Sequence, residues 1–366
     1  MMNCELRQLN TFIKSCSTSN AAIKNTASPI PKEGWYPAYS ASGQDVWLPE
    51  YRYSGKGIVV SAVGARCGKC FQADGKWNVT ANTHVLLVDE SIADYKYCWY
   101  LLNNENWWIK SGSGQPFVKV KDSLNRSILL PDLSTQQHIA AILDKISEGT
   151  AVCGKMMDEL DLMVKAKFVE MFGNIPETEF VTMGSVCSLI TDGTHQPPKF
   201  VDSGIPFLFV SNITTNMLTY NAEKFISAET YAELMKRTPV EIGDILLSTV
   251  GSYGHPAIVK SNKQFSFQRH IAFLKPRHNI IDSTFLHSAI LTAGVQRQIE
   301  AKVKGIAQKT LNLSEIRTLR FPLPPLQEQE RYAALVKNIN KSKLTIQEIR
   351  DKMETEKLAL MQGYFG

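Results

Sequence analysis

The chain has 366 residues, of which 44% are hydrophobic, and it carries a formal net charge of +5. Because domains average about 150 residues, this length predicts about two domains, each with enough apolar side chains for a core. The composition excludes collagen, a disordered tail and a disulfide miniprotein, and no apolar run reaches the roughly 18 residues of a membrane span. Seven scattered cysteines and a start without an apolar signal core predict a cytoplasmic protein with no membrane partner.

Residues 1–133 predict a first globular domain of the α+β class. Short apolar runs at Ile58–Val63 and His84–Val88 are typical of strands, and Tyr97–Leu102 is typical of a short helix. The segment has a net charge of +3, as does the second globular segment, whereas the stretches after them are close to neutral. Positive charge in two large blocks suits a polyanion that is contacted at two places.

Residues 134–173 predict one long helix. Ser134 and Gln137 have the spacing of a capping box, and Gly173 suits the end of the helix. Apolar or small residues alternate at steps of four and three, which is the seam of a coiled coil. This first seam runs through Ile142, Ile146, Gly149, Cys153, Met156, Leu160 and Met163.

Residues 174–323 predict a second α+β globule, and residues 324–366 predict a second long helix. Ile245–Val250 is typical of a strand, and Pro324 with Pro325 suits a helix start. The second seam runs through Leu335, Ile339, Ser342, Ile346, Ile349, Met353, Glu356 and Leu360.

The chain is an internal duplication. Adding 193 to each position of the first seam gives the second, so that Gly149 falls on Ser342. An offset of about 187 aligns Ile58–Gly64 with Ile245–Gly251. The order is therefore globule, helix, globule, helix. Two helices of matched length and phase are expected to pack on each other, and a duplicated chain tends towards a pseudo-twofold arrangement that suits a target with two related halves.

Motifs of catalysis are missing from the sequence. It contains no P-loop, no H-E-x-x-H, no G-x-S-x-G and no Asn/Asp-Pro-Pro-Tyr/Phe methyltransferase motif. Cys67 and Cys70 form a C-x-x-C pair without a second pair at zinc-ribbon spacing, which favours a structural role over a metal or redox role. His84 and His270 recur in the repeat, either as strand-end side chains bonded to backbone or as DNA contacts. The sequence thus offers no candidate catalytic residue, and no metal site is expected.

Three features resemble the DNA-specificity (S) subunit of type I restriction–modification enzymes. They are the duplicated arrangement, the segment Asp192-Gly-Thr-His-Gln-Pro-Pro followed by Gly204–Ile213, and the Leu-Pro-x-Leu-x-x-Gln helix starts at Leu130 and Leu323. The similarity covers essentially the whole chain. The first globule departs from the usual opening, because Ser40–Asp45 stands where the second globule has its Gly-Ile-Pro-Phe-Leu segment. It resembles another variety of target-recognition domain.

The resemblance implies that each globule is a target-recognition domain for one half of a bipartite, asymmetric DNA sequence. It implies that the two helices pack as an antiparallel coiled coil that spaces the half-sites. The implied partners are double-stranded DNA and two methyltransferase subunits that carry S-adenosylmethionine, with a motor–nuclease subunit in the restriction form. This chain itself would be non-catalytic and would bind no cofactor.

Side chains beside polar, Gly-rich loops are the candidate DNA contacts. Those expected to contact phosphates are Arg66, Lys69, Lys119, Lys121, Lys304 and Lys309. Those expected to read bases are Gln44, Thr194, His195, Gln196, Asn212, Tyr253, His255 and Arg269.

Three other functions remain open at this point. A DNA-acting enzyme with an unrecognised site would show activity as a purified chain. A structural protein whose coiled coil forms between two chains would show the mass of a dimer in solution. A specificity subunit that serves modification only would lack a restriction gene among its genomic neighbours.

Overall fold

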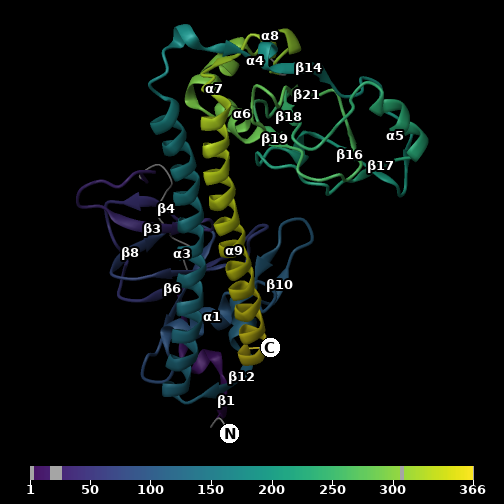
Figure 1. The fold of residues 1–366 in the computed structure, drawn as a ribbon. Helices are drawn as coiled ribbons and strands as arrows, with labels where there is room; N and C mark the ends of the chain where they lie inside the picture. Colours follow the sequence, from purple (N-terminus) through teal and green to yellow (C-terminus); the bar gives the residue numbers. More distant parts are fainter. Residues whose placement is uncertain (1–3, 17–26, 306–308, 366) are drawn as a thin grey trace. The chain divides into compact units, whose positions relative to one another are not determined.

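A computed structural model describes residues 4–16, 27–305 and 309–365 (Figure 1). The chain divides into two units, and each combines one globule with half of each long helix. One unit comprises residues 1–153 and 348–366, and the other comprises residues 154–347. Each globule contains sheets and short helices, so the α+β class is confirmed.

The first globule is built on two four-stranded sheets, ordered β2-β9-β6-β7 and β4-β3-β8-β5. Its strands are β1 (Cys4–Gln8), β2 (Ile13–Cys16), β3 (Tyr36–Ser40), β4 (Gly43–Leu48), β5 (Tyr53–Ser54), β6 (Gly57–Ser61), β7 (Cys70–Ala73), β8 (Lys76–Val79), β9 (Thr83–Val88), β10 (Lys110–Ser111), β11 (Phe117–Val118) and β12 (Ser127–Pro131). Its short helices are α1 (Tyr95–Leu102) and α2 (Val120–Leu124), with a 3-10 turn at Leu9–Thr11.

The second globule also has two four-stranded sheets, ordered β14-β21-β18-β19 and β15-β17-β16-β20. Its strands are β13 (Val181–Thr182), β14 (Cys187–Asp192), β15 (Phe200–Val201), β16 (Ile205–Leu208), β17 (Lys224–Ile226), β18 (Ile245–Ser248), β19 (Pro256–Ile258), β20 (Ser266–Phe267), β21 (Ile271–Pro276) and β22 (Arg320–Phe321). Its helices are α4 (Met183–Val186), α5 (Ala228–Met235), α6 (Ser283–Ile290), α7 (Ala293–Lys302) and α8 (Leu313–Arg317), with 3-10 turns at Glu177–Glu179 and Val210–Asn212.

The first-named sheet of each globule has the same topology. In both, the strand order matches element by element and every pairing is antiparallel. The duplication extends to single hydrogen bonds. The Val118 N–H donates to the Ala62 carbonyl at 2.9 Å, and the Leu311 N–H donates to the Thr249 carbonyl at 2.8 Å. The internal repeat predicted from the sequence is therefore present in the fold.

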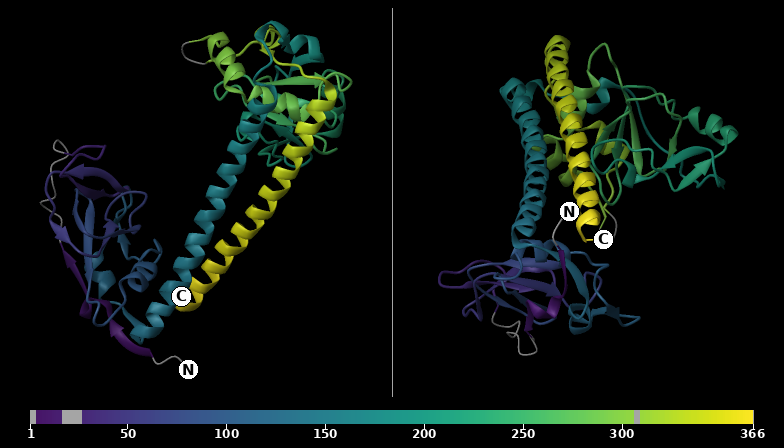
Figure 2. Two further views of the ribbon diagram at one scale, coloured as in Figure 1. Left: turned by 60° about the vertical axis from the view of Figure 1, so that its left-hand side comes forward. Right: turned by 90° about the horizontal axis from the view of Figure 1, so that it is seen from below.

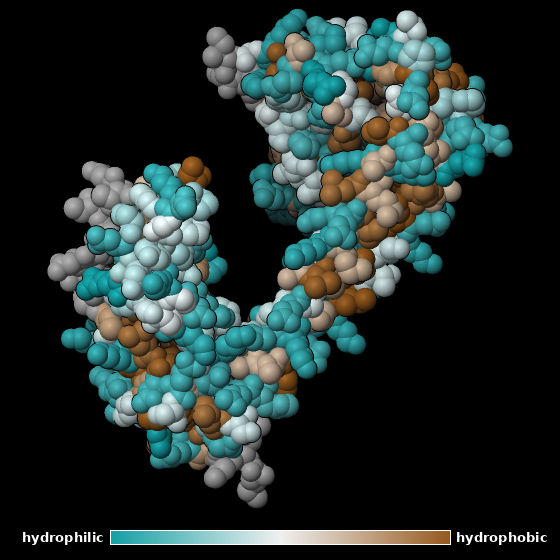
Figure 3. Space-filling view, turned by 90° about the vertical axis from the view of Figure 1, so that its left-hand side faces the viewer, coloured by the Kyte–Doolittle hydropathy of each residue, from teal (hydrophilic) through white to brown (hydrophobic). Residues whose placement is uncertain are grey.

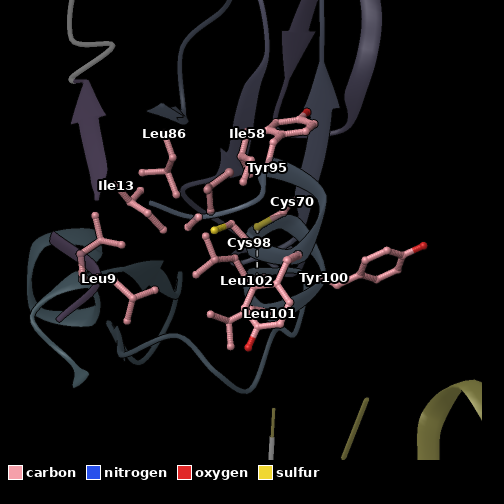
Figure 4. Close-up of a cluster of buried hydrophobic side chains, with 14 of the residues drawn as sticks. Leu9, Ile13, Ile58, Cys70, Leu86, Tyr95, Cys98, Tyr100, Leu101 and Leu102 are labelled. Carbon is pink, nitrogen blue, oxygen red and sulfur yellow. Dashed lines mark hydrogen bonds between the residues drawn. The ribbon is translucent and has the colours of Figure 1, made fainter. Parts of the chain in front are cut away.

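The core of each globule lies where α1 or α6 covers this shared sheet. In the first globule, α1 places Cys98, Leu101 and Leu102 against Ile58 and Leu86 of the sheet (Figure 4). The central strands β6 and β18 are buried along their whole length. A fully apolar strand of this kind is typical of a sheet that is covered on both faces.

The long helices are α3 (Leu133–Phe172) and α9 (Leu326–Phe365), each of 40 residues. Their halves run antiparallel within each unit and lie side by side in Figures 1 and 2. In the first unit, Lys357 donates to the Ser147 hydroxyl at 2.7 Å. In the second unit, the Tyr332 hydroxyl donates to the Val164 carbonyl at 3.3 Å. The antiparallel pairing implied by the resemblance is confirmed within each unit.

The predicted seam is correct in part. Cys153 and Ile339 are buried, and Ile142, Ile146, Leu160, Leu335, Ile346 and Met353 are half-buried. Met156, Met163 and Ile349 are exposed, at 44%, 55% and 49%, so their assignment to the buried seam was wrong. The more buried neighbours are Met157 and Arg350. A straight helix has 3.6 residues per turn and drifts by about 20° per heptad from a strict 3.5 repeat, which moves the seam by one position here.

Glutamine, and not the predicted capping box, holds each long helix at its start. Gln136 and Gln329, the last residues of the two Leu-Pro-x-Leu-x-x-Gln segments, are fully buried. Gln329 accepts from the Asp282 N–H at 2.9 Å and donates to the Pro324 and Ile280 carbonyls at 2.8 and 3.1 Å.

Gln136 makes the equivalent set of bonds with Asp94, Pro131 and Ile92. The predicted capping pair, Ser134 with Gln137, lies exposed inside the helix. Asp132 caps the helix instead, because its carboxylate accepts from the Thr135 N–H at 3.0 Å. This N–H bond lowers the pKa of Asp132.

Candidate nucleic-acid interface

Most of the predicted contacts of the second globule gather at one edge of its shared sheet. Here β14 and β18 end and β21 begins, and the loops are tied by backbone bonds. The Thr194 N–H donates to the Phe267 carbonyl, and the Arg269 N–H donates to the Thr194 carbonyl. We call residues 193–196, 249–254, 268–270, 304–305 and 309–310 the second rim. Residues 306–308 of the predicted Gly-x-x-Gln loop lie outside the described residues.

The first globule has an equivalent edge, formed by residues 62–69, 80–82 and 112–118, which we call the first rim. The Gly64 N–H donates to the Pro116 carbonyl at 2.8 Å. In the second rim, the Gly251 N–H makes the equivalent bond to the Lys309 carbonyl at 3.2 Å. Both glycines have positive φ, at 95° and 72°, which a side chain would strain. The fold therefore presents matched loops at matched edges.

The contacts predicted in the first globule lie at or near the first rim, with one exception. Arg66 is exposed and Lys69 is half-buried within it, while Lys119 and Lys121 are exposed just after it. Gln44 lies on β4 of the other sheet, where its side chain is exposed and donates to the Val46 carbonyl. Gln44 is therefore not part of the first rim.

The Asp-Gly-Thr-His segment forms a rigid loop at the end of β14. A Cβ on Gly193 would lie 2.2 Å from the Phe267 carbonyl oxygen, so the close approach of the two strands requires glycine. The Thr194 hydroxyl donates to the Gln196 carbonyl at 2.8 Å. His195 extends from this loop, with Nε2 lying 2.9 Å from the Asp192 carboxylate.

The predicted lysines of the second rim are exposed but paired with carboxylates. Lys304 lies 3.3 Å from Glu315, and Lys309 lies 3.1 Å from Glu300. The hydrogen bond to Glu300 raises the pKa of Lys309. The Tyr253 hydroxyl also donates to Glu300, so this predicted base reader is tied to an ion pair.

Two other predicted base readers have partners inside the globule. Asn212 is only 5% exposed, and its amide bonds to Phe209, Thr219 and Asn221, so it stabilises a turn and is removed from the set of base readers. His255 is half-buried, and its Nδ1 lies 3.1 Å from the Asn216 side-chain oxygen.

Sequence reasoning missed two residues that shape this globule. Arg237, after α5, forms an ion pair with Asp192 across 45 residues of chain. His287 on α6 is half-buried, with Nε2 between the Asn216 and Pro256 carbonyls at 3.0 and 3.1 Å. Burial lowers the pKa of His287. Neither pairing has a local signal in the sequence, because the partners meet only in the folded sheet.

A metal-binding cluster of three or more His, Cys, Asp or Glu residues is absent from the described part of the chain. Cys67 and Cys70 are both buried thiols, and the Cys70 thiol donates to the Leu102 carbonyl at 3.3 Å (Figure 4). Burial raises the pKa of Cys70, which disfavours the reactive thiolate. Among the described helices, none is long and apolar enough to cross a membrane.

Comparison with known proteins places this architecture in one family. The family model for the type I restriction modification DNA specificity domain matches residues 10–160 and 177–355. The EcoBI specificity subunit of Escherichia coli is 30% identical over 147 residues, which span 40% of this chain and 31% of that protein. The MjaVIII specificity subunit of Methanocaldococcus jannaschii is 24% identical over 303 residues, spanning 76% of this chain and 70% of the other.

Solved structures show the same fold. The S subunit of a type I restriction–modification system from M. genitalium superposes with a TM-score of 0.60 at 14% identity, covering 100% of this chain and 96% of that one. A chain from a structure of type I R-M complex assembly and conformational transition has a TM-score of 0.56 at 16% identity, covering 97% of each. Because the family model matches both halves, the chain belongs to the DNA-specificity (S) subunits of type I restriction–modification systems.

Proposed function

We propose that this S subunit reads a bipartite, asymmetric DNA site, with the first rim contacting one half-site and the second rim the other. The duplicated edge supports this proposal, because both globules present loops through the same backbone bonds from the same sheet. Loops on a rigid frame commonly carry the residues that read a partner. The loops themselves differ in sequence, so the two half-sites are expected to differ as well.

The ion pairs of Lys304 and Lys309 are compatible with phosphate contacts. Exposed ion pairs are worth about 0–1 kcal/mol, so a phosphate can replace the carboxylate at little cost. Phosphate contacts would position the globule, and the side chains on the rim would supply sequence preference. Thr194, His195, Gln196 and Arg269 carry that second role in the proposal.

The long helices are the proposed spacer and docking surface. A helix of 40 residues is about 60 Å long, which exceeds the 34–36 Å of one DNA turn. Large apolar side chains are exposed along both helices, and Figure 3 shows apolar surface there. They are Val152, Met156, Leu162, Met163, Val169, Leu344, Ile349 and Leu358.

Exposed apolar surface of this kind favours a protein partner. The proposed partners are two methyltransferase subunits, which supply S-adenosylmethionine and the chemistry, with a motor–nuclease subunit in the restriction form. On this proposal the S subunit is itself non-catalytic. Methyl transfer or DNA cleavage by the purified chain alone would contradict that role and support an enzyme with an unrecognised site.

Methylome sequencing of cells with and without this gene tests the proposal. The expected result is a motif of two specific blocks separated by unspecified bases, present only with the gene. Lengthening both helices by one heptad each should widen the gap and leave both blocks unchanged. A change in the blocks, with the gap unchanged, would argue against the spacer role.

A further inference from the structure

One carboxylate in the second globule orients two exposed hydrogen-bond donors. Asp192 ends β14, and its side chain is only 14% exposed. One carboxylate oxygen accepts from the Arg237 guanidinium, and the other lies 2.9 Å from Nε2 of His195. Arg237 and His195 remain 52% and 53% exposed. Asp192 therefore orients Arg237 and His195, and both side chains remain accessible to a ligand from the solvent.

The segments that carry Asp192 and Arg237 are themselves held in place by the surrounding structure. β14 pairs with β21 up to Asp192 opposite Ala272. Gly193 then passes so close to the Phe267 and Gln268 carbonyls that a Cβ at this position would lie 2.2 and 2.5 Å from their oxygens. Arg237 follows α5, and the chain after it returns over the sheet, where Lys275 donates to the Pro239 carbonyl at 3.1 Å.

The chemistry of the pair suits a base better than a phosphate. Asp192 is 14% exposed, whereas Glu300 beside Lys309 is 61% exposed, so Asp192 is released to solvent less easily. It therefore continues to neutralise much of the Arg237 charge, which weakens the attraction of Arg237 to phosphate. The planar fork of Arg237 keeps further N–H donors in a fixed geometry, however, and the carboxylate restricts their direction. Two parallel donors match the O6 and N7 acceptors of guanine in the major groove.

We propose that Arg237 determines specificity by reading a guanine in the half-site of the second globule, and that Asp192 is its positioning residue. This inference rests on the proposed function, since it requires that the second rim contact DNA. α5 and the turn that carries Arg237 have no counterpart among the described elements of the first globule, where β4 and β6 are joined through the short β5. The contact therefore belongs to one half-site only.

The test uses the full-length S subunit assembled with its methyltransferase subunits, acting on a library of random-sequence DNA. Methylated molecules are sequenced to give the preference at each position. For Arg237→Ala we expect one guanine position in one block to relax by about 5- to 150-fold, with the other block unchanged. Arg237→Lys should not restore the preference, because a lysine lacks the planar fork.

Asp192→Asn tests the positioning role. It should relax the same position, and adding it to Arg237→Ala should have little further effect there. A purely structural role for Asp192 would instead reduce methylation of all sequences without changing the preference at one position. Arg297→Ala on α7 is the matched control, since Arg297 is exposed and outside the second rim, and it should leave the motif unchanged.

Two results would overturn the inference. One is an unchanged motif for Arg237→Ala. The other is a uniform loss on all sequences with a lower salt dependence, which would make Arg237 a phosphate contact. Arg237→Lys and Arg237→Ala keep Asp192, so the test remains decisive if Asp192→Asn weakens the fold. Failure of the proposed function is distinguishable, because the unaltered complex would then yield no bipartite motif.

Discussion

The two globules share one sheet and differ in the other. The sheets β2-β9-β6-β7 and β14-β21-β18-β19 have one topology and the same rim hydrogen bonds. The second sheets share a three-stranded pattern, in which β3 pairs antiparallel with β4 and parallel with β8, and β16 pairs antiparallel with β17 and parallel with β20. Their outer strands differ, since β5 pairs with β8 whereas β15 pairs with β17.

This difference separates a frame from its variable parts. The frame comprises the shared sheet, the helix that covers it and the start of the long helix, all joined by one buried glutamine. The variable parts are the second sheet and the segment between β17 and β18, where α5 has no counterpart among the described elements of the first globule. A frame of this kind lets two halves of a chain read different sequences from the same geometry.

The largest expected effect comes from breaking the frame at its glutamine. Replacing Gln329 by Leu leaves the Asp282 N–H and two carbonyls buried without a partner, at about 1–3 kcal/mol for each such group. We expect a loss of about 3 kcal/mol in the second globule for Gln329→Leu, and the same loss in the first for Gln136→Leu.

Tryptophan fluorescence during urea unfolding separates the two cases, because all six tryptophans lie in the first globule. Gln136→Leu should lower the midpoint reported by tryptophan, and Gln329→Leu should lower only the midpoint of a probe in the second globule. Gln327→Ala, on the exposed side of the same turn, is the control and should change neither. Equal shifts of the tryptophan signal in both Leu variants would show that the two frames are not independent.

The sequence was sufficient for the frame and insufficient for the site. Strands β6, β9 and β18 were predictable because each is a short apolar run, and the long helices because their apolar period is sustained. The duplication supports these assignments further, because the same pattern occurs in both halves of the chain. The seam failed at Met156 and Ile349, since a strict heptad and a straight helix diverge with length.

Site residues depend on contacts between distant segments, which local patterns do not record. Asn212 has the polarity of a base reader, but its loop folds back and uses the whole amide. Arg237 gives no local signal, and only the folded sheet brings it to Asp192. By contrast, the Asp-Gly-Thr-His loop was recognisable, because its glycine and threonine serve the turn itself.

A second way to separate the globules uses pH. His287 is half-buried with its Nε2 between two carbonyls in the second globule, whereas the aligned position in the first globule is Trp99. Burial lowers the pKa of His287 below its ordinary value of about 6.5. As pH falls through that value, the unfolded chain takes up a proton that the folded globule does not, so stability decreases.

The expected slope is up to about 1.4 kcal/mol per pH unit below pH 6.5, until the folded histidine is protonated as well. Urea unfolding at pH 7 and pH 5 measures it with a probe in the second globule. His287→Gln should remove this part of the slope while Gln keeps a donor for the Asn216 carbonyl. An unchanged slope in that variant would assign the pH dependence to other groups of the second globule, such as His270, whose pKa is also lowered by burial.

The lysines of the two rims differ in whether a carboxylate pairs with them. Lys121 is exposed beside the first rim, and Lys309 in the second rim is paired with Glu300. Lys121→Ala should weaken binding of the assembled complex to all DNA sequences alike and lower the salt slope by about one. Lys309→Ala should act in the same direction but less, because its carboxylate partner is released at the same time. A change in sequence preference in either variant would make that lysine a base reader.

The smallest effect distinguishes two glycines of α3 that lie five residues apart. A Cβ on Gly154 meets nothing within 4 Å, whereas a Cβ on Gly149 would lie 2.2 Å from the methyl carbon of Met353 on α9. Alanine is favoured over glycine in a helix by about 1 kcal/mol, so Gly154→Ala should stabilise by about that amount. In Gly149→Ala the same gain is offset, because Met353 must turn its flexible end away and lose packing. Thermal unfolding should therefore show a higher midpoint for Gly154→Ala only. A similar rise for Gly149→Ala would mean that the seam is loosely packed at Gly149 and Met353. If the contact is the cause, Met353→Ala in the Gly149→Ala background should restore the gain.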